Sequence, residues 1–550
     1  MNPIPPAPLP DAGREKAAAV ATAAGAAAAP PSLVAKGFGG SGAVEVSPNQ
    51  LVATCLDARD RLGGRLATMV GWDDRAASGA FRLAYVFAVG DGWWSVETVL
   101  DPARPVFPSV TPHLPAAHWY EREVRDLLGL EPDGHPDHRR LVLHENWPDG
   151  VYPLRKDFDP RTPVPMVEAP PPRFHSLHGD GIVEIPVGPI HAGVIEPGHF
   201  RFAAVGELVL HLEARLFYTH RGLEKLVEGR LAGDVLPIVE RICGVCGVSH
   251  QVSFCQAVEA IAEVEVPPRA RAIRTVALEL ERLYNHVGDL GNLAAGAGFA
   301  VAAMQGARLK DELQRLAEQI TGSRFLRGLG RVGGVARDLD PEARRLLAAT
   351  LGRFGSEYNR LADLLFTTES FVERMTTTGV LDRATAATFG AVGVAARASG
   401  LERDARHDHP HAWYGEIAPP PVGGSGGALP IAVRQTGDVH ARALVRHDEI
   451  RASLRLIRHL LDHLPGGPYQ VAVPERLPPS RTALGVTESP RGENLHWLRS
   501  AADGTIDRYR VRSASYPNWP CVALAVPGNM VPDFPLINKS FELCYSCLDR

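Results

Sequence analysis

Two Cys-x-x-Cys pairs, placed far apart in a chain of 550 residues, are the feature that most limits how this sequence can fold. The first pair, Cys243 and Cys246, lies in RICGVCGVSH, and the second, Cys544 and Cys547, lies in ELCYSCLDR. Two residues between thiols let both sulfurs face one metal ion at a turn or a helix start. If all four thiols belong to one site, the fold must bring the last residues back to the middle of the chain.

Four thiolates suit zinc, an iron–sulfur cluster, or nickel with iron. Structural zinc modules usually carry both cysteine pairs within a few tens of residues, whereas residues 247–543 separate the pairs here. The spacing therefore disfavours a plain zinc site. Considered alone, the first pair is equally consistent with an unrelated redox or structural role. The adjacent Arg241 and helix N-terminal amides are expected to lower the pKa of the first two thiols.

The other cysteines and the overall charge exclude several classes of protein. Seven cysteines, four of them in two tight pairs, argue against a secreted disulfide framework and favour reduced thiols in the cytoplasm. Cys55, Cys255 and Cys521 are expected to behave as small buried hydrophobic residues. The net charge of −5 gives no reason to bind nucleic acid. No apolar run approaches the roughly 18–20 residues that cross a bilayer, so work at a membrane would depend on partners.

Composition along the chain predicts four consecutive regions. Residues 1–45 are rich in Pro and Ala and are predicted to be a disordered tail without a secretory signal. Residues 46–159 are predicted to form a small α+β domain, with a hairpin at its Gly-Asp-Gly and a helix over 118–130. Residues 160–180, which begin with a proline-rich run, are predicted to be an extended linker. Residues 181–550 are predicted to form a second, larger domain.

The second domain is predicted to be a helical bundle with peripheral β-strands. Apolar and polar residues alternate around 183–213, which predicts strands. Residues from 251 to about 390 have helical periodicity, and Asp340 and Pro341 are predicted to be the N-cap and first residue of one helix. Antiparallel helices packed in a bundle bury such faces. Short strands and turns are expected from about 480 onward. The predicted fold class is therefore α+β.

Taken together, the two cysteine motifs resemble the signature pair of nickel–iron hydrogenase large subunits. Further segments resemble group 4 of that family, the energy-converting and formate-hydrogenlyase type: GPIHAGVIEPGHFRF, YTHRGLEKLVEGR, ESPRGENLHWL and SASYPNWP. In the first domain, WYEREVRDLLGLEPDGHPDHRRLVLHENWPDGVYPLRKDF resembles the 30-kDa subunit of respiratory complex I. The resemblance runs from about residue 50 to the end. It implies a complex I 30-kDa-like domain fused to a catalytic domain related to the complex I 49-kDa subunit.

The resemblance implies a nickel–iron centre held by the four paired cysteines. Cys243 and Cys544 are expected to be terminal ligands of nickel. Cys246 and Cys547 are expected to bridge nickel to an iron that carries carbon monoxide and cyanide. The implied activity is the reversible conversion of H2 to two protons and two electrons.

Other residues acquire expected roles from the motifs that they match. Cys544 is expected to take a proton first, and Glu196, in EPGH, to relay it. Arg491 matches the arginine that overhangs the vacant site and contacts the cyanides, and His250 matches a hydrogen-bond donor to a bridging sulfur. Glu224 aligns with a carboxylate that helps hold Mg²⁺ in other hydrogenase groups; an intrachain salt bridge is the alternative.

The resemblance also implies partners, because the chain has no further cysteine cluster for an iron–sulfur relay. Electrons are expected to pass to a small subunit with a 4Fe–4S cluster, and onward to ferredoxin-like or formate dehydrogenase subunits. Membrane ion-translocating subunits are expected to hold the complex on the inner face of the cell membrane. The motifs leave open whether H2 is evolved or consumed.

Two departures from the family pattern lie near the last cysteine pair. Glu542-Leu543 stands where the family usually has Asp-Pro, so a rigid turn before Cys544 is lost. Arg550 stands where other hydrogenases have a histidine, and a guanidinium does not bind Mg²⁺. Precursors in the family are often cleaved after this position, so we expect either a processed chain or a gene without an extension.

Two alternatives remain at this point. One is a complex I-type quinone-reducing module without nickel, although such proteins lack the four cysteines. The other is a non-catalytic assembly subunit whose cysteines bind zinc or no metal.

Overall fold

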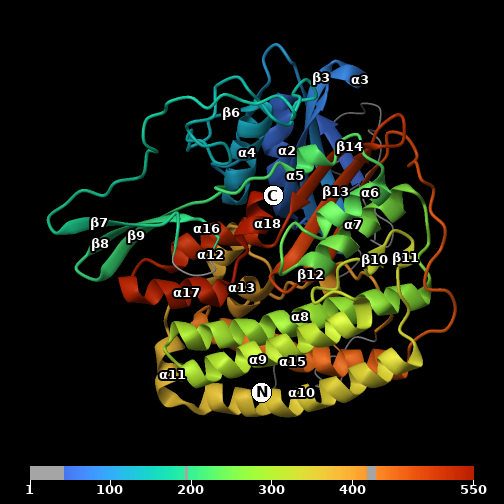
Figure 1. Cartoon of the computed structure of the whole chain (residues 1–550). Helices are drawn as coiled ribbons and strands as arrows, with labels where there is room; N and C mark the ends of the chain where they lie inside the picture. The colour runs from blue at the N-terminus through green and yellow to red at the C-terminus, as the bar shows by residue number, and fades with distance from the viewer. Residues whose placement is uncertain (1–41, 192–195, 418–428) are drawn as a thin grey trace, which may run out of the picture. The chain divides into compact units, whose positions relative to one another are not determined.

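The structure, a computed structural model, describes three stretches of the chain, residues 42–191, 196–417 and 429–550 (Figure 1). Most of the predicted N-terminal tail therefore lies outside the described residues. Residues 42–45, which we predicted to belong to that tail, lie in strand β1 (Gly42–Val46), where Val44 and Val46 are buried. None of the helices in the described part of the chain combines the length and apolar composition that crossing a bilayer requires.

Contacts between residues divide the chain into two compact units. The first unit ends at His138 and also includes Leu154–Phe158, and the second contains Arg139–Pro153 and everything from Asp159 onward. The segment 139–153 belongs to the second unit because its side chains pair with residues there. For example, the His144 ring bonds the main-chain oxygen of Leu216 at 3.0 Å.

The first unit is a four-stranded sheet covered by two helices. The strands follow the order β1, β4 (Gly92–Leu100), β3 (Ala80–Val89) and β2 (Arg65–Asp74), with β1 parallel to β4 and the other pairs antiparallel. Val89 pairs with Gly92 across a two-residue turn, which confirms the predicted hairpin. Helix α2 (Pro48–Asp60) packs on β4, and α4 (His118–Leu128), which confirms the predicted helix, packs on β2. Short elements complete the unit: α3 (Arg75–Ser78), β5 (Val106–Pro108), η1 (Pro115–Ala117) and β6 (Glu131–Asp133).

The proline-rich segment belongs to the second unit, and residues 160–180 form no helix or strand. The first sheet of this unit is antiparallel and confirms the strands predicted around 183–213: β7 (Ile182–Val187), β8 (His199–Val205) and β9 (Leu208–Arg215). Two short helices then lead to the first cysteine pair, α5 (Leu223–Leu226) and α6 (Ala232–Val239).

Four long helices form the predicted bundle, and they lie side by side in Figure 1. They are α8 (Pro268–Gly296), α9 (Ala300–Thr321), α10 (Pro341–Thr367) and α15 (Val439–Asp462). Asp340 caps α10 as predicted, because its carboxylate accepts hydrogen bonds from the N–H groups of Glu342 and Ala343. Helices α8 and α9 cross closely at Gly291 and Gly306, where a Cβ on Gly306 would lie 2.7 Å from the Gly291 Cα.

A second antiparallel sheet packs against α7 (Gly247–Ile261). Its strands are β12 (Thr482–Ser489), β13 (Gly492–Ser500) and β14 (Ile506–Arg512). Shorter elements connect the bundle to this sheet: β10 (Gly330–Arg331), β11 (Gly334–Val335), α11 (Glu369–Met375), α12 (Arg383–Thr388), α13 (Gly393–Ala398), α14 (Ala405–Asp408) and η2 (Tyr414–Glu416). The predicted α+β class is confirmed by this combination of sheets and bundle.

The last forty residues differ from the strands and turns that we expected there. Beyond β14 the chain forms α16 (Ser515–Ala525), η3 (Val531–Asp533), α17 (Phe534–Phe541) and α18 (Tyr545–Asp549). Pro520 lies inside α16, where proline disfavours helix. Eight of the eleven residues of that helix are buried, including Trp519 at 0% exposure, so tertiary packing outweighs the local preference against helix.

Candidate metal centre

The four paired cysteines meet at one point, although they lie far apart in the sequence. The Sγ atoms of Cys243, Cys246, Cys544 and Cys547 all lie within 4.8 Å of one another. All four side chains are buried, and the surrounding core is apolar, with Ile242, Val239 and Phe254 among its members. Four sulfur donors converging in a dry site match the preference of soft metals such as nickel and iron. The donor set therefore fits a nickel–iron group.

The first pair is positioned by the start of α7. Cys246 is the residue before this helix, and its N–H donates to the Sγ of Cys243 at 3.1 Å. A carboxylate from α8 satisfies the next donors: Glu281 accepts hydrogen bonds from the N–H groups of Val248 (2.7 Å) and Ser249 (3.0 Å). Burial raises the pKa of Glu281 to about 7. We did not identify Glu281 from the sequence, because its partners lie on another helix.

The surroundings of the thiols do not lower the pKa of Cys246, although we expected Arg241 and the helix amides to do so. Arg241 does not approach the sulfurs; it pairs with Glu240 and is half exposed. Hydrogen bonding with the other three thiols, together with burial, raises the pKa of the Cys246 thiol well above its ordinary value. Four thiolates this close repel one another, so their joint deprotonation requires a bound cation.

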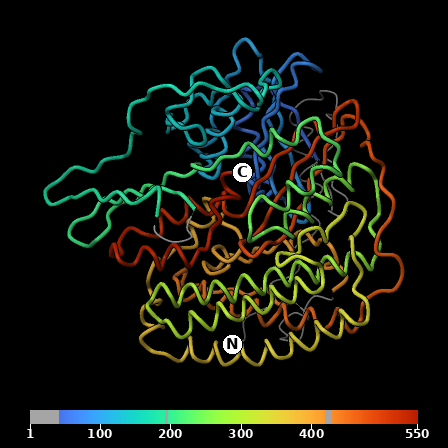
Figure 2. Tube along the Cα trace, viewed as in Figure 1, coloured from blue at the N-terminus to red at the C-terminus, as the bar shows by residue number. Residues whose placement is uncertain are grey.

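The second pair is held by residues from two other segments. The Ser515 hydroxyl accepts a hydrogen bond from the N–H of Cys544 at 3.0 Å and lies 3.8 Å from the Sγ of Cys547. Asp549, just beyond the pair, accepts hydrogen bonds from the N–H groups of Phe217 (3.0 Å) and Thr219 (2.9 Å). Figure 2 shows the red C-terminal trace beside the green trace that carries these residues. These bonds therefore anchor the end of the chain to the segment that directly follows strand β9.

Arg221 links the two cysteine pairs directly. Its guanidinium donates to the main-chain oxygen of Ile242 at 2.7 Å, beside the first pair, and to that of Ser546 at 2.9 Å, within the second. Arg221 lies in YTHRGLEK, a segment that we quoted for its resemblance to group 4 hydrogenases without giving this residue a role. The motif was therefore a signal for a residue that joins both halves of the site.

Arg491 lies at the turn between β12 and β13 and is 4% exposed. Its guanidinium donates two hydrogen bonds, of 2.5 and 2.9 Å, to the Asp289 carboxylate of α8. The guanidinium also lies 3.8 Å from the Glu542 carboxylate. Burial favours neutral Asp289, but the Arg491 charge outweighs it and holds the pKa of Asp289 well below its usual range. Although burial opposes this shift, the negative charge of Asp289 in turn raises the pKa of Arg491 well above its ordinary value.

The turn that carries Arg491 is tightly packed. At Gly393, which has φ +65°, a Cβ would lie 2.3 Å from the Arg491 main-chain oxygen. Glycine is required here for both reasons, since φ is positive and the two backbones touch. The backbone of Arg491 is thereby held in place independently of its side chain.

Glu542, one of the two departures from the family pattern, ends α17 in the left-handed conformation, with φ +51°. Its carboxylate accepts a hydrogen bond from Asn292 at 2.5 Å. Burial and repulsion from Asp289 raise the pKa of Glu542 to about 7. The chain thus makes the turn before Cys544 without proline.

Glu196 and His250 both lie near the cysteines. Glu196 is exposed, and its carboxylate accepts a hydrogen bond from the N–H of Ser546, between the two cysteines of the second pair, at 2.7 Å. His250 is fully buried one helical turn after Cys246 and bonds His496 at 2.9 Å. Burial and the charge of Arg221 lower the pKa of His250 to about 3, so its ring is neutral.

Glu224 does not fit a magnesium site. Its two oxygens are occupied by three guanidiniums, those of Arg508 (2.9 Å), Arg510 (3.2 Å) and Arg550 (2.9 Å). Although burial opposes ionisation, these charges hold the pKa of Glu224 well below its usual range. A divalent cation would meet three positive charges there, so the salt bridge that we considered as the alternative is the observed arrangement.

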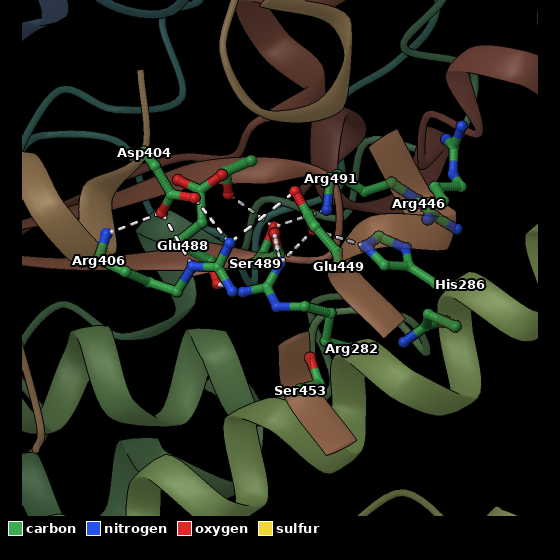
Figure 3. A network of polar contacts seen from close by, with 12 residues as sticks. Arg282, His286, Asp404, Arg406, Arg446, Glu449, Ser453, Glu488, Ser489 and Arg491 are labelled. Carbon is green, nitrogen blue, oxygen red and sulfur yellow. Dashed lines mark hydrogen bonds and ion pairs between the residues drawn. The ribbon is translucent and has the colours of Figure 1, made fainter. Parts of the chain in front are cut away.

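A network of buried ion pairs and hydrogen bonds includes His286, Glu449 and Glu488 (Figure 3). The His286 ring also lies 3.5 Å from the Asp289 carboxylate. His286, one turn before Asp289, bonds Glu449 of α15 at 2.8 Å. Arg397 joins Glu449 to Glu488 of β12, and its bond to Glu488 measures 2.8 Å. Every member of a buried charge network needs a partner, and this one locks α8 and α15 to the strand that leads to Arg491.

The other cysteines behave as expected: Cys55, Cys255 and Cys521 are buried and unpaired with one another. Burial raises the pKa of the Cys255 and Cys521 thiols to about 12. In the described part of the chain, the four clustered cysteines are the group of His, Cys, Asp and Glu side chains that converges tightly enough to hold a metal.

Comparison with known proteins places the two units in related families. The model of the respiratory-chain NADH dehydrogenase 30 Kd subunit matches residues 44–164. The 49 Kd subunit model matches residues 297–485 and 475–550, and the nickel-dependent hydrogenase model matches residues 221–303.

Individual proteins match over most of the chain. Formate hydrogenlyase subunit 5 of Escherichia coli (strain K12) is 41% identical, covering 89% of this chain and 85% of that protein. Hydrogenase-4 component G of the same organism is 37% identical, covering 88% and 84%. A solved chain from the membrane-bound sulfane sulfur reductase, an archaeal respiratory membrane complex, superposes with a TM-score of 0.62 at 28% identity. That likeness covers 67% of this chain and 99% of the other.

Proposed function

The chain belongs to the group 4 nickel–iron hydrogenase large subunits of formate-hydrogenlyase type, in which a complex I 30-kDa-like domain precedes the catalytic domain, and from this premise we propose how its residues act. The protein is the catalytic subunit of a multisubunit hydrogenase, which interconverts H2 with two protons and two electrons. The observation that carries this function is the convergence of four buried sulfurs within 4.8 Å.

The four cysteines would hold the metals in defined roles. We assign Cys243 and Cys544 to nickel as terminal ligands, and Cys246 and Cys547 to positions between nickel and iron. We propose that this iron carries carbon monoxide and cyanide. When bound, the metal pair supplies an open coordination position at which H2 is split or formed.

The protein supplies the path for the proton. We propose that the Cys544 sulfur takes the proton released from H2, and that Glu196 passes it between the site and solvent. Two observations support this path: Glu196 bonds the N–H of Ser546, two residues after Cys544, and its side chain is exposed. A carboxylate that reaches both the site and water can exchange protons without opening the core.

Arg491 and the apolar core would set the electrostatics of the reaction. The Asp289 carboxylate fixes the Arg491 guanidinium in place, so its orientation costs no further ordering when charge develops at the metals. We propose that this guanidinium also hydrogen-bonds the cyanides. The buried residues around the sulfurs exclude water, which strengthens each of these interactions.

Electrons need a route out of the chain. Beyond the four cysteines, the described residues present no further cluster that could hold an iron–sulfur centre. We therefore propose that a small subunit with a 4Fe–4S cluster accepts the electrons, and that ferredoxin-like subunits carry them onward. The relatives are named as subunits or components of larger complexes, which supports such partners. We further propose peripheral attachment to the cytoplasmic face of the membrane through ion-translocating subunits.

Metal analysis and infrared spectroscopy of the intact purified complex test this function. We expect nickel together with infrared bands from iron-bound carbon monoxide and cyanide, and iron in excess of nickel because the clusters of the partner subunits also contain iron. The variants Cys243→Ser and Cys547→Ser should lose the nickel and the infrared bands, whereas Cys521→Ser, which changes a buried cysteine outside the cluster, should retain both. Zinc without nickel would favour the assembly subunit, and absence of both nickel and zinc from an active, intact complex would favour the quinone-reducing module.

A further inference from the structure

Three buried side chains form a hydrogen-bonded row that begins beside the first cysteine pair. The Nδ1 of His250, on α7, lies 2.9 Å from the Nε2 of His496, on β13. The Nδ1 of His496 lies 2.7 Å from the hydroxyl oxygen of Tyr509, on β14. All three residues are at most 1% exposed. None of the roles proposed above uses His496 or Tyr509.

The hydroxyl of Tyr509 decides the direction of the whole row. Within the described residues, its single hydrogen-bonding partner is the Nδ1 of His496. If the hydroxyl accepted a bond from this nitrogen, its own proton would be a buried donor without an acceptor, which is unfavourable. The Tyr509 O–H therefore donates, and the Nδ1 of His496 accepts.

The protons of the two rings follow from this direction. A neutral imidazole that accepts at one nitrogen carries its proton on the other. The Nε2–H of His496 therefore donates to the Nδ1 of His250, and the proton of His250 must be on its Nε2. Both rings are neutral, since burial and the neighbouring His250 lower the pKa of His496 well below its usual range, as burial does for His250.

His250, which would carry this Nε2–H, lies on the same helix face as Cys246. His250 follows Cys246 by one turn, with its N–H bonded to the Cys246 main-chain oxygen at 2.9 Å, so the two side chains share one helix face. The Nε2 atom is buried and has no hydrogen-bond partner among the residues described. A buried donor in this position needs an acceptor, and Cys246, on the same helix face, offers a sulfur of the cluster.

We propose that Tyr509 and His496 are positioning residues that fix the tautomer of His250 and so make its Nε2–H a donor to a thiolate of the four-cysteine centre. The inference rests on the proposed function to the extent that the thiolates carry metals. A hydrogen bond to a thiolate withdraws electron density from the sulfur and hence from the metals. Tyr509, which touches no metal ligand in this row, would thereby tune the electronic state of the centre.

Four variants of the intact complex separate this role from general packing. Tyr509→Phe removes the hydroxyl that donates to His496. His496→Leu removes the ring that bonds both Tyr509 and His250. His496→Gln keeps the direction of both hydrogen bonds, because its amide N–H can donate to His250 while its amide oxygen accepts from Tyr509. Tyr358→Phe is the matched control: it removes another Tyr–His hydrogen bond, from the buried Tyr358 to the Nδ1 of the partly buried His447 at 2.8 Å, in the helical bundle.

The first readout is the infrared band of iron-bound carbon monoxide. Without the hydrogen bond the sulfur donates more charge to iron, so we expect a shift to lower wavenumber in Tyr509→Phe and His496→Leu. We expect no shift in His496→Gln or Tyr358→Phe. An unchanged band in both Tyr509→Phe and His496→Leu, with normal bands in the unmodified complex, would overturn the inference.

The second readout does not depend on the metals. Magic-angle-spinning NMR of the complex labelled with 15N-histidine reports which nitrogen of each ring is protonated, and comparison with His250→Gln assigns the His250 signals. We expect a single tautomer with the proton on Nε2, and a mixture in Tyr509→Phe. A proton on Nδ1 in the unmodified protein would overturn the inference. Absence of the infrared bands from the unmodified complex would instead count against the proposed function and leave this measurement decisive.

Discussion

The Glu196 carboxylate accepts a hydrogen bond of 2.7 Å from the main-chain N–H of Ser546, a residue 350 positions away in the sequence. The bond joins an exposed carboxylate to the residue that lies between the two cysteines of the second pair in the sequence. This bond supports the proposal that Glu196 passes protons between Cys544 and solvent.

Replacing Glu196 with glutamine should reduce hydrogenase activity by roughly 100-fold or more, the usual contribution of a proton-transfer group. The amide oxygen can still accept the bond from Ser546, but the side chain no longer carries a proton. H2 oxidation and H2–D2O exchange by the intact complex measure the effect, with nickel content expected to be unchanged. Glu207→Gln, another exposed glutamate, is the control. Full activity in Glu196→Gln would exclude this carboxylate from the path.

Breaking the ion pair between Arg491 and Asp289 should destabilise the second unit. Arg491→Met leaves the Asp289 charge buried with fewer partners, which costs about 3–5 kcal/mol. Arg491→Lys keeps the charge but loses the bidentate hydrogen bond to Asp289. We therefore expect a smaller loss of stability than in Arg491→Met, together with a large loss of activity. Urea denaturation and H2 oxidation report the two effects. Equal activity in Arg491→Lys and the unmodified enzyme would show that the guanidinium geometry is not needed.

Deleting residues 544–550 should abolish nickel binding, because it removes two of the four sulfurs and the Asp549 anchor. The first unit has its own sheet and core, so we expect it to stay folded and resistant to limited proteolysis. The double variant Cys544→Ser/Cys547→Ser keeps the anchor and serves as the comparison. Nickel retained at full occupancy in the truncated chain would contradict a four-cysteine site.

Stability should depend on Glu488 between mildly acidic and neutral pH. Burial and repulsion from Asp404 raise its pKa to about 7, even though Arg397, Arg282 and Arg406 oppose the shift. In the unfolded chain a glutamate titrates near 4.3. Between these values the folded state binds the extra proton, so stability falls as pH rises from about 4.3 to about 7 and then levels off.

Glu488→Gln should remove that part of the pH dependence. Melting temperatures measured at intervals from pH 5 to 8 should fall less steeply than for the unmodified protein. Glu475→Gln, which alters an exposed glutamate, should leave the profile unchanged. Identical slopes in Glu488→Gln and the unmodified protein would show that Glu488 titrates normally in the folded state.

Magnesium should have no effect on the complex at Glu224. Three guanidiniums already neutralise this carboxylate, so we expect that treatment with EDTA followed by Mg²⁺ changes neither the melting temperature nor the activity. Glu224→Gln should lower the melting temperature, because it leaves three buried positive charges without their anion. Stoichiometric magnesium that is lost in Glu224→Gln would reverse this assignment.

Local patterns in the sequence determined much of the architecture. The Asp340–Pro341 helix start and the Gly-Asp-Gly hairpin depend on a few neighbouring residues, and both are observed. The last helices were not foreseen, because α16 is stabilised by the burial of residues such as Trp519 against distant parts of the chain. Local propensity cannot contain that contribution.

For the four-cysteine site too, the sequence determined one part and the tertiary structure determined the other. The sequence by itself determined that four thiols, an arginine and a glutamate with the right chemistry were present. Only the tertiary structure decided that Ser515 holds Cys544, that Asp289 holds Arg491, and that Tyr509 lies behind His496. These partners are 13, 29 and 202 positions apart in the sequence, so no single periodicity or spacing relates them. They meet because packing of the bundle, the sheet and the final helices brings these polar groups within hydrogen-bonding distance of one another.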